Sequence, residues 1–293
     1  MKWSSGYPAK SQKWVATGKE SVAQPKRLLV PQGVSTSGCR KRIIKEALSP
    51  IIQRHSYFLP MKSPDSHFYA NPLTSGVLTL SLEESTHAIR VCRASEGDVL
   101  RLADGEGHFA NGKIVEADAK GCKVQIDTVE TTLIPEPQIH LGLACLKDEA
   151  NEEVVFHSAQ LLVGSVTLLR TEYSQEPKNS DLQKVIRRSE LKSLVGLKQS
   201  LKPWLTKILG PVTLEDWLQN YRGDIILCDI NGTSEVPSIA TTTTLLVGPE
   251  GGFSEKEVTQ IKAFRNGRVH LLKLGETRLR ARTAAVVALG KLL

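Results

Sequence analysis

Two glycine-containing loops near the C-terminal end carry the residues best suited to hold a ligand. The apolar residues 245–247 run into Gly248-Pro249-Glu250-Gly251-Gly252, and a second apolar run continues into Leu274-Gly275. Glycine has no side chain, so backbone amides and carbonyls in such loops can lie close to a flat ligand. Neither loop has the glycine spacing of a dinucleotide site or of a phosphate-binding loop. The first loop, taken alone, is as compatible with a structural turn as with a binding site.

Alternating strands and helices are predicted to position these loops. Near-continuous apolar runs, typical of a parallel sheet covered on both faces, occur at residues 139–146, 166–169, 224–228, 244–247 and 269–272. Ligands of such sheets bind outside the carboxyl ends of the strands, where both loops lie. Ser254 and Glu257 have the spacing of a capping box and predict a helix directly after the first loop.

The last helix is expected to be hidden on almost every side. Residues 283–290 read Thr-Ala-Ala-Val-Val-Ala-Leu-Gly. A helix without a polar face is buried in a core or in a subunit interface, and its small residues allow close approach. We therefore expect a homodimer that forms through this C-terminal helix.

A small β-barrel is predicted before the stiff connector at residues 133–137. Short alternating runs at residues 77–80, 98–102 and 109–115 follow a first strand at residues 67–69, and Asp-Gly-Glu-Gly at residues 104–107 predicts a hairpin turn. A helix is predicted over residues 81–93, because Ser81 and Glu84 have capping-box spacing. This helix directs Arg90 and Arg93 to one face, which is either a solvated edge or a phosphate contact.

A long amphipathic helix is predicted over residues 182–201. Its apolar stripe consists of Leu182, Val185, Ile186, Leu194, Val195 and Leu201. A second stripe is cationic and consists of Lys184, Arg188, Lys192, Lys198 and Lys202. Such a stripe is a solvated face or a row of phosphate contacts.

The first 60 residues carry the excess of positive charge. The chain has a formal net charge of +7, but residues 1–60 hold 11 Lys and Arg against Glu20 and Glu46. This leader, residues 1–60, has no sustained helix or strand period and no secretory apolar core. Three origins fit it: an organelle transit segment, a mis-assigned start before Met61, or a basic RNA-binding tail.

The remaining composition excludes several classes of protein. The five cysteines are scattered without a CxxC pair and fit neither a disulfide framework nor a zinc site. The seven histidines show no metal-ligand spacing, so we expect no metal. No apolar run approaches the roughly 18 residues of a membrane span. We expect a cytoplasmic protein that does not enter a membrane, with import into an organelle as the alternative if the leader is a transit segment.

The two loops together resemble the RsmE family, which methylates N3 of a uridine in 16S ribosomal RNA. The resemblance rests on residues 246–254, Leu-Val-Gly-Pro-Glu-Gly-Gly-Phe-Ser, followed by Leu274-Gly275 and Leu279-Arg280, and covers about residues 67–293. Residues 198–202, Lys-Gln-Ser-Leu-Lys, match a form of the family's central helix motif. The resemblance implies an α/β SPOUT methyltransferase domain with a trefoil knot and a parallel sheet at residues 138–293. It also implies a PUA-like β-barrel RNA-binding domain at residues 61–133.

The resemblance further implies S-adenosyl-L-methionine as cofactor. Backbone groups of three loops would hold it, at Leu227, Cys228, Val247, Gly248, Pro249, Glu250, Gly251, Leu272, Leu274, Gly275 and Leu279. A side chain at Gly251 is expected to occupy cofactor space. Arg280 is expected to orient the nucleotide or its phosphate, and Glu250 is the nearest carboxylate for the N3 proton, with capping of its own loop as the alternative. The expected partner is ribosomal RNA or the assembled small subunit, bound by Arg90, Arg93, Lys198 and Lys202.

Some residues depart from the family's pattern. The family usually reads Arg-Thr-Glu-Thr-Ala where residues 280–284 read Arg-Ala-Arg-Thr-Ala, so Arg282 replaces a carboxylate. The family's Lys-Ala-Thr-Glu-Leu-Gly corresponds to His-Ser-Ala-Gln-Leu-Leu at residues 157–162, and residues 143–148 replace a more basic loop. These departures keep a second function open, a knotted RNA-binding protein whose methyltransferase activity is lost or redirected.

Overall fold

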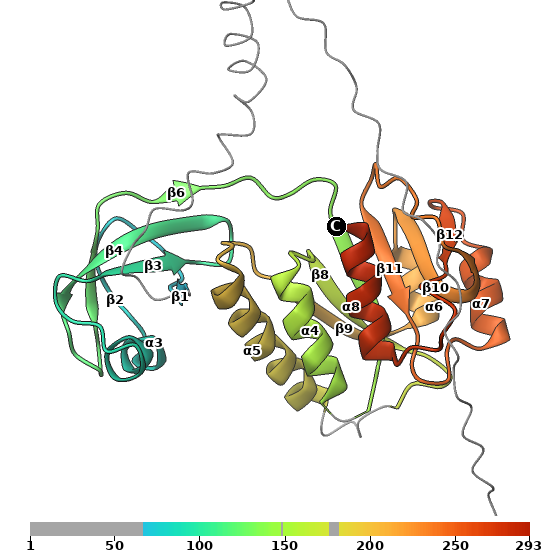
Figure 1. Cartoon of the computed structure of the whole chain (residues 1–293), viewed down its shortest axis with the longest axis horizontal. Coiled ribbons are helices and arrows are strands. Elements are labelled where there is room, and N and C mark those ends of the chain that lie inside the picture. The colour runs from blue at the N-terminus through green and yellow to red at the C-terminus, as the bar shows by residue number, and fades with distance from the viewer. Residues whose placement is uncertain (1–66, 148, 176–181) are drawn as a thin grey trace, which may run out of the picture. The chain divides into compact units, whose positions relative to one another are not determined.

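The structure, a computed structural model, describes residues 67–147, 149–175 and 182–293 (Figure 1). The predicted leader of residues 1–60, with Met61, lies outside the described residues. Two sheets are present. The helix with the predicted RNA-binding arginines lies between two strands of the first sheet, and strands of the second sheet end in the predicted cofactor loops.

The first sheet has the strand order β1-β3-β4-β5-β2, with β6 paired to β4. Its strands are β1 Phe68–Tyr69, β2 Gly76–Thr79, β3 Val99–Ala103, β4 His108–Glu116, β5 Lys123–Ile126 and β6 Glu130–Thr131. Alternate residues of β3, β4 and β5 point into one apolar core around Leu100, Leu102, Ile114 and Val124. The predicted barrel strands are therefore confirmed, with ends shifted by one residue.

The helix predicted over residues 81–93 is present but divided. α3, Leu82–Thr86, continues into a π-helical turn, η1, His87–Val91. Ser81 caps α3 as predicted, since its Oγ accepts a hydrogen bond from the Glu84 backbone N–H at 3.2 Å. The Glu84 carboxylate is bound to Lys198 and does not complete a capping box. Arg93 ends the segment in the left-handed conformation, with φ of 56°.

The second sheet is parallel throughout, in the order β12-β10-β11-β7-β8-β9. Its strands are β7 Ile139–Ala144, β8 Ser165–Arg170, β9 Lys207–Thr213, β10 Asp224–Thr233, β11 Thr243–Val247 and β12 Val269–Leu272. Five of the six coincide with the predicted apolar runs. The predicted α/β class with a parallel sheet is confirmed.

Helices cover both faces of this sheet (Figure 1). They are α4 Ala150–Gln160, α5 Leu182–Ser200, α6 Leu214–Asn220, α7 Glu255–Lys262 and α8 Ala281–Leu292. In β11, Leu245 and Val247 face a core shared with α4 and α8, whereas Leu246 faces a second core shared with α6 and α7. Burial on both faces explains why these strands are mostly apolar and do not alternate apolar and polar residues.

Strand β9 is not among the predicted strands. It contains Gly210-Pro211, and proline cannot donate a ladder hydrogen bond, which argues against a central strand. β9 is an edge strand that pairs only with β8, and its register shifts between Thr167 and Leu169. Edge strands tolerate proline, so the local pattern was misleading.

Helix α5 buries a different face from the predicted apolar stripe. Val195 is 44% exposed, whereas Ser189, Ser193, Gly196 and Leu197 are buried. A Cβ atom added at Gly196 would lie 2.5 Å from the Cβ atom of Ala159 in α4. Small residues let the two helices approach closely, so the contact face is not the most apolar one. The predicted stripe is therefore wrong at Val195, whereas Val185 does pack against the core.

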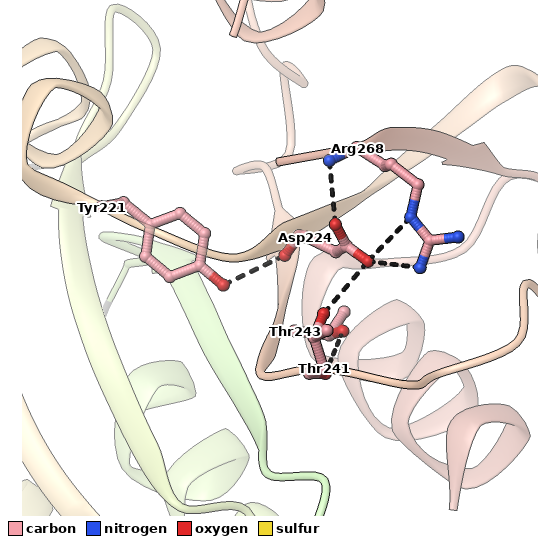
Figure 2. Close-up of polar contacts among 5 residues, drawn as sticks. All are labelled: Tyr221, Asp224, Thr241, Thr243 and Arg268. Atoms are coloured by element: carbon pink, nitrogen blue, oxygen red, sulfur yellow. Dashed lines mark hydrogen bonds and ion pairs between the residues drawn. The ribbon is translucent and has the colours of Figure 1, made fainter. Parts of the chain in front are cut away.

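Asp224 ties the amino ends of β10, β11 and β12 together (Figure 2). Its carboxylate accepts hydrogen bonds from the Arg268 backbone N–H at 2.8 Å, from the Arg268 guanidinium at 2.6 Å and from the Thr241 hydroxyl at 3.2 Å. The Tyr221 hydroxyl donates to the Asp224 carbonyl at 3.0 Å. The hydrogen bond from Arg268 lowers the pKa of the Asp224 carboxyl. These hydrogen bonds hold the amino ends of the three strands in place relative to one another. The carboxyl ends of the same strands lie at the opposite edge of the sheet.

A buried ion pair joins the end of α5 to the barrel helix α3. The Lys198 ammonium lies 2.7 Å from the Glu84 carboxylate, with side chains that are 16% and 5% exposed. The His67 backbone N–H donates to the Lys198 carbonyl at 2.8 Å. Nearby, the Gly107 N–H donates to the Pro203 carbonyl at 2.8 Å, and a Cβ atom at Gly107 would overlap the Trp204 indole. The barrel is thus connected both to the end of α5 and to the segment that follows it.

Replacing Leu162 by glycine is expected to stabilise the protein by about 0.5–1 kcal/mol. Leu162 follows the end of α4 with φ of 58°, a left-handed conformation that strains a residue with a Cβ atom. It occupies the position where the resembled family has glycine. Urea unfolding would measure the change. Gln160→Gly, at the last residue of α4, is the control and should destabilise the protein, because glycine is the weaker helix former and the hydrogen bond from Gln160 to Gln199 is lost. Equal losses in both variants would contradict the strain.

His67 is expected to make stability fall on mild acidification. Burial, followed by the charge of Arg101, lowers the pKa of its imidazole to about 4. The unfolded chain takes up the proton below about pH 6.5, whereas the folded chain does not until about pH 4. Stability is therefore lost as the pH falls through this window, by about 1 kcal/mol between pH 7 and 5.5. Urea unfolding of His67→Gln should show a pH slope smaller by this amount, and an unchanged slope would contradict it.

None of the helices within the described ranges is long and apolar enough to cross a membrane.

Candidate functional site

Three loops meet at the carboxyl ends of β10, β11 and β12. A guanidinium nitrogen of Arg278, in the loop after β12, donates to the Glu250 carbonyl in the loop after β11 at 2.6 Å. The Lys273 N–H donates to the carbonyl of Thr233, the last residue of β10, at 2.7 Å. The structure therefore brings together the three loops that the sequence predicted as cofactor-binding.

A cleft of about 150 Å³ lies between residues 228–230 of β10 and the loop after β12 and is called the β12-loop cleft here. It is lined by five predicted cofactor residues: Cys228, Leu272, Leu274, Gly275 and Leu279. A Cβ atom added at Gly275 would meet no atom within 4 Å. The space beside this glycine is open and can admit a ligand.

A second cleft of about 490 Å³, the α7 cleft, lies between β10 and α7. It is lined by Leu227, Phe253 and Val258, among others, and shares Cys228, Asp229 and Ile230 with the β12-loop cleft. The shared residues belong to a bulge in β10, where the register shifts between Cys228 and Thr233. Small-molecule sites usually measure roughly 300–1,000 Å³. A ligand in the β12-loop cleft would therefore extend past its walls.

Cys228 forms an uncharged wall of both clefts. Burial raises the pKa of its thiol to about 12, so the thiol stays protonated at neutral pH. A protonated thiol is a weak nucleophile and behaves as a small apolar side chain. Cys228 is suited to contact a ligand and not to attack it.

The loop after β11 is stabilised by burial and by hydrogen bonds between its own residues. Val247 and Pro249 are buried, and the Gly252 N–H donates to the Pro249 carbonyl at 2.8 Å. The predicted capping box of α7 is confirmed, since Ser254 and Glu257 exchange both of its hydrogen bonds. Residues 247–251 line neither cleft, and a Cβ atom at Gly251 would lie 3.2 Å from the Tyr173 side chain. The structure gives Gly251 a protein neighbour where cofactor space was expected.

The two predicted catalytic side chains are exposed. Among the described residues, neither the Glu250 carboxylate nor the Arg280 guanidinium makes a hydrogen bond or an ion pair. Arg282, which replaces the family's carboxylate, donates to Glu153 of α4 at 2.7 Å. The reversed charge is therefore matched by an acid in the same chain.

The predicted RNA-binding residues divide into two groups. Arg90 and Arg93 of the barrel and Lys202 beyond α5 are exposed, as a phosphate contact requires. Lys198 is instead committed to the buried Glu84 carboxylate, because leaving that carboxylate unpaired would cost several kcal/mol. The prediction that Lys198 binds RNA is corrected on this ground.

Several residues at the site were missed in the sequence. Arg278 stands next to the recognised Leu279-Arg280 pair, and this proximity could have identified it. Asp229 and Ile230 line both clefts, but nothing in the sequence predicts the bulge that puts them there. Tyr173 carries no local signal, because its neighbour Gly251 is far away along the chain.

Another hollow, of about 330 Å³, lies at the amino ends of β10 and β12 among Asp224, Arg268 and His270. It contains none of the predicted site residues. Within the described ranges, no three His, Cys, Asp or Glu side chains are grouped so that they could hold a metal ion.

Comparison with known families first defines the class. A model described as an RNA methyltransferase domain matches residues 134–293, and one described as an RNA methyltransferase PUA domain matches residues 81–127. The first match contains the parallel sheet and all three loops. The chain belongs to the RNA methyltransferase family.

Individual proteins similar to this chain point to one family of RNA methyltransferases. Ribosomal RNA small subunit methyltransferase E of Mycobacterium tuberculosis is 25% identical over 76% of this chain and 89% of its own length. The enzyme of the same name from Mesomycoplasma hyopneumoniae is 25% identical over 57% of this chain and 74% of its own length. The predicted resemblance to the RsmE family is confirmed.

Solved structures of similar proteins have the same fold. A Legionella pneumophila methyltransferase determined with bound S-adenosylmethionine is 26% identical, with a TM-score of 0.68 over 77% of this chain and 95% of its own. Ribosomal RNA small subunit methyltransferase E of Neisseria gonorrhoeae, at 20% identity and a TM-score of 0.69 over the same shares, supports the fold alone. The predicted SPOUT fold with a preceding PUA-like barrel is confirmed.

Proposed function

We propose that this protein transfers a methyl group from S-adenosyl-L-methionine to N3 of a uridine in small-subunit ribosomal RNA. One observation carries the proposal: the three loops predicted from the family motifs converge at one sheet edge and are tied by the hydrogen bond from Arg278 to the Glu250 carbonyl. The names of the relatives supply the substrate class.

The residues of the loops fit the cofactor. The side chains of Leu227, Val247 and Leu272 are buried in the protein cores, so these positions offer a ligand only backbone groups. Gly275 leaves open space beside that backbone, and Cys228 adds an uncharged wall. When bound, the cofactor supplies an electrophilic methyl group. Residues 247–251 are included in the proposed site because the hydrogen bond from Arg278 to the Glu250 carbonyl ties their loop to the loop after β12.

The protein's part in the reaction is to position the nucleotide and to accept the proton that leaves N3. Methyl transfer to N3 requires that nitrogen to lose its proton, so most of the catalysis is alignment and charge stabilisation. Glu250 is the proposed proton acceptor, because its exposed carboxylate is not used in capping its own loop. Arg280 is proposed to bind the nucleotide or its phosphate with its unpaired guanidinium.

The wider assembly belongs to the same proposal. Residues 61–133 and 138–293 are proposed as the RNA-binding and methyltransferase domains, with Arg90, Arg93 and Lys202 as phosphate contacts. A homodimer is proposed through α8, whose exposed positions Thr283, Val287 and Gly290 recur at helical spacing and combine small and apolar residues. The proposed location is the cytoplasm.

Mass spectrometry of ribosomal RNA tests the proposal. RNA from cells lacking the gene should lose one methylated uridine, which a plasmid copy of the gene should restore. Purified protein with radiolabelled cofactor should methylate small-subunit RNA, as a transcript or as assembled subunits. Tight RNA binding without transfer would favour the second candidate, a binding protein without turnover, for which Arg282 is the motivating residue.

A further inference from the structure

Tyr173 is a half-exposed aromatic residue beside the proposed site. It follows the carboxyl end of β8 and is 49% exposed. Its ring lies against Gly251, since a Cβ atom there would be 3.3 Å from ring atoms of Tyr173. Leu143 of β7 pairs with both Val247 of β11 and Leu168 of β8, so the two strands end within two residues of each other at the same edge of the sheet. The ring therefore stands at the sheet edge where ligands of parallel sheets bind.

The turn that carries Tyr173 is rigidly held. The Ser174 hydroxyl accepts from the Thr171 N–H at 3.0 Å and donates to the Thr171 carbonyl at 2.8 Å. The Glu257 carboxylate accepts from the Glu172 N–H and from the Ser254 N–H, each at 2.8 Å. Glu257 is only 8% exposed. One buried acid thus fixes the turn after β8 to the loop after β11, and little freedom remains to be lost when a ligand binds.

Packing within the protein does not explain why an aromatic ring lies at position 173. Tyr221, the other tyrosine of the α/β part, stacks on Trp217 with ring centroids 4.4 Å apart and uses its hydroxyl in a hydrogen bond. The Tyr173 hydroxyl makes no hydrogen bond to any described residue, and half of its side chain faces solvent. Its glycine neighbour offers no side chain to cover it.

We propose that Tyr173 is a stacking platform for the RNA base that receives the methyl group. This inference rests on the proposed function. A base that is to be modified must leave its stack, and proteins hold splayed-out RNA bases on aromatic rings. The ring contacts Gly251, which directly follows Glu250, the proposed acceptor of the N3 proton. A base on Tyr173 would thus lie next to the groups that act on it.

The test compares Tyr173→Ala, Tyr173→Phe and Tyr173→Trp in the full chain, with small-subunit ribosomal RNA as the substrate. Base stacking predicts that the alanine variant raises the KM for RNA about tenfold or more, while calorimetry gives wild-type affinity for S-adenosylmethionine. The phenylalanine variant should retain the wild-type KM, because the ring and not the hydroxyl stacks. The tryptophan variant should show fluorescence quenching on RNA binding beyond that of the wild type. Leu209→Ala, which shortens an exposed apolar side chain of edge strand β9, is the control.

Each contrary result is distinct. A wild-type KM in Tyr173→Ala overturns the proposal, as does a phenylalanine variant as poor as alanine. Weaker cofactor affinity with an unchanged KM for RNA would assign the ring to the cofactor instead. A wild-type protein that neither binds nor methylates RNA would refute the proposed function itself, whatever the Tyr173 variants do.

Discussion

Replacing Gly275 by valine is expected to weaken S-adenosylmethionine binding about a hundredfold or more. A Cβ atom at this position points into open space of the β12-loop cleft, so the valine side chain would fill the cleft without striking the protein. Overlap with a bound ligand costs about 1–3 kcal/mol for each forced contact, and about 2.7 kcal/mol is a hundredfold in Kd. Titration calorimetry with the purified variant measures the change.

The control for this variant is Gly121→Val. Gly121 lies in a turn of the barrel, where an added Cβ atom would make an ordinary contact of 3.5 Å with Thr79. Both variants should melt as the wild type does, and only Gly275→Val should lose the cofactor. If Gly275→Val binds S-adenosylmethionine normally, the cofactor does not occupy the β12-loop cleft.

Replacing Lys198 by methionine is expected to destabilise the protein by about 3–5 kcal/mol. The substitution keeps the volume of the side chain but leaves the Glu84 carboxylate buried without its cation. Urea unfolding measures the loss. Lys202→Met, four residues further and exposed, should change stability by less than about 0.5 kcal/mol.

A second substitution separates the ion pair from other roles of Lys198. Adding Glu84→Leu to Lys198→Met removes the buried charge and should restore most of the lost stability, because apolar replacements of buried pairs are often neutral. If Lys198→Met were as harmless as Lys202→Met, the pair would have no structural role and Lys198 would again be a candidate for RNA binding.

Local patterns were sufficient for much of the fold. The apolar run of β11, the glycines after it and the Ser254–Glu257 capping box lie within a few residues of one another, and each was predicted correctly. These features are specified by neighbouring residues in the chain. The same holds for the barrel strands and for the Ser81 cap of α3.

Features that depend on distant contacts were missed or misread. The partner of Lys198 is Glu84, 114 residues earlier, so the helical stripe of cations could not reveal that one member is neutralised. The buried face of α5 was misread because Ser189, Ser193 and Gly196 owe their burial to small size and not to apolarity. The bulge after Cys228 and the contact between Tyr173 and Gly251 likewise arise only when separate segments meet.

The pairing of β7 with β11 has a consequence for how the chain is made. Leu141 pairs with Val166 of β8 on one side and with Leu245, about 100 residues later, on the other, so β7 leaves the ribosome long before its neighbour β11 is made. At roughly 5–20 residues per second, the wait lasts about 5–20 s, during which an apolar strand edge is uncovered. The barrel can complete its own sheet earlier, but Glu84 has no cationic partner until Lys198 has been synthesised. A nascent chain stalled between residues 144 and 198 would therefore be the form most dependent on chaperones.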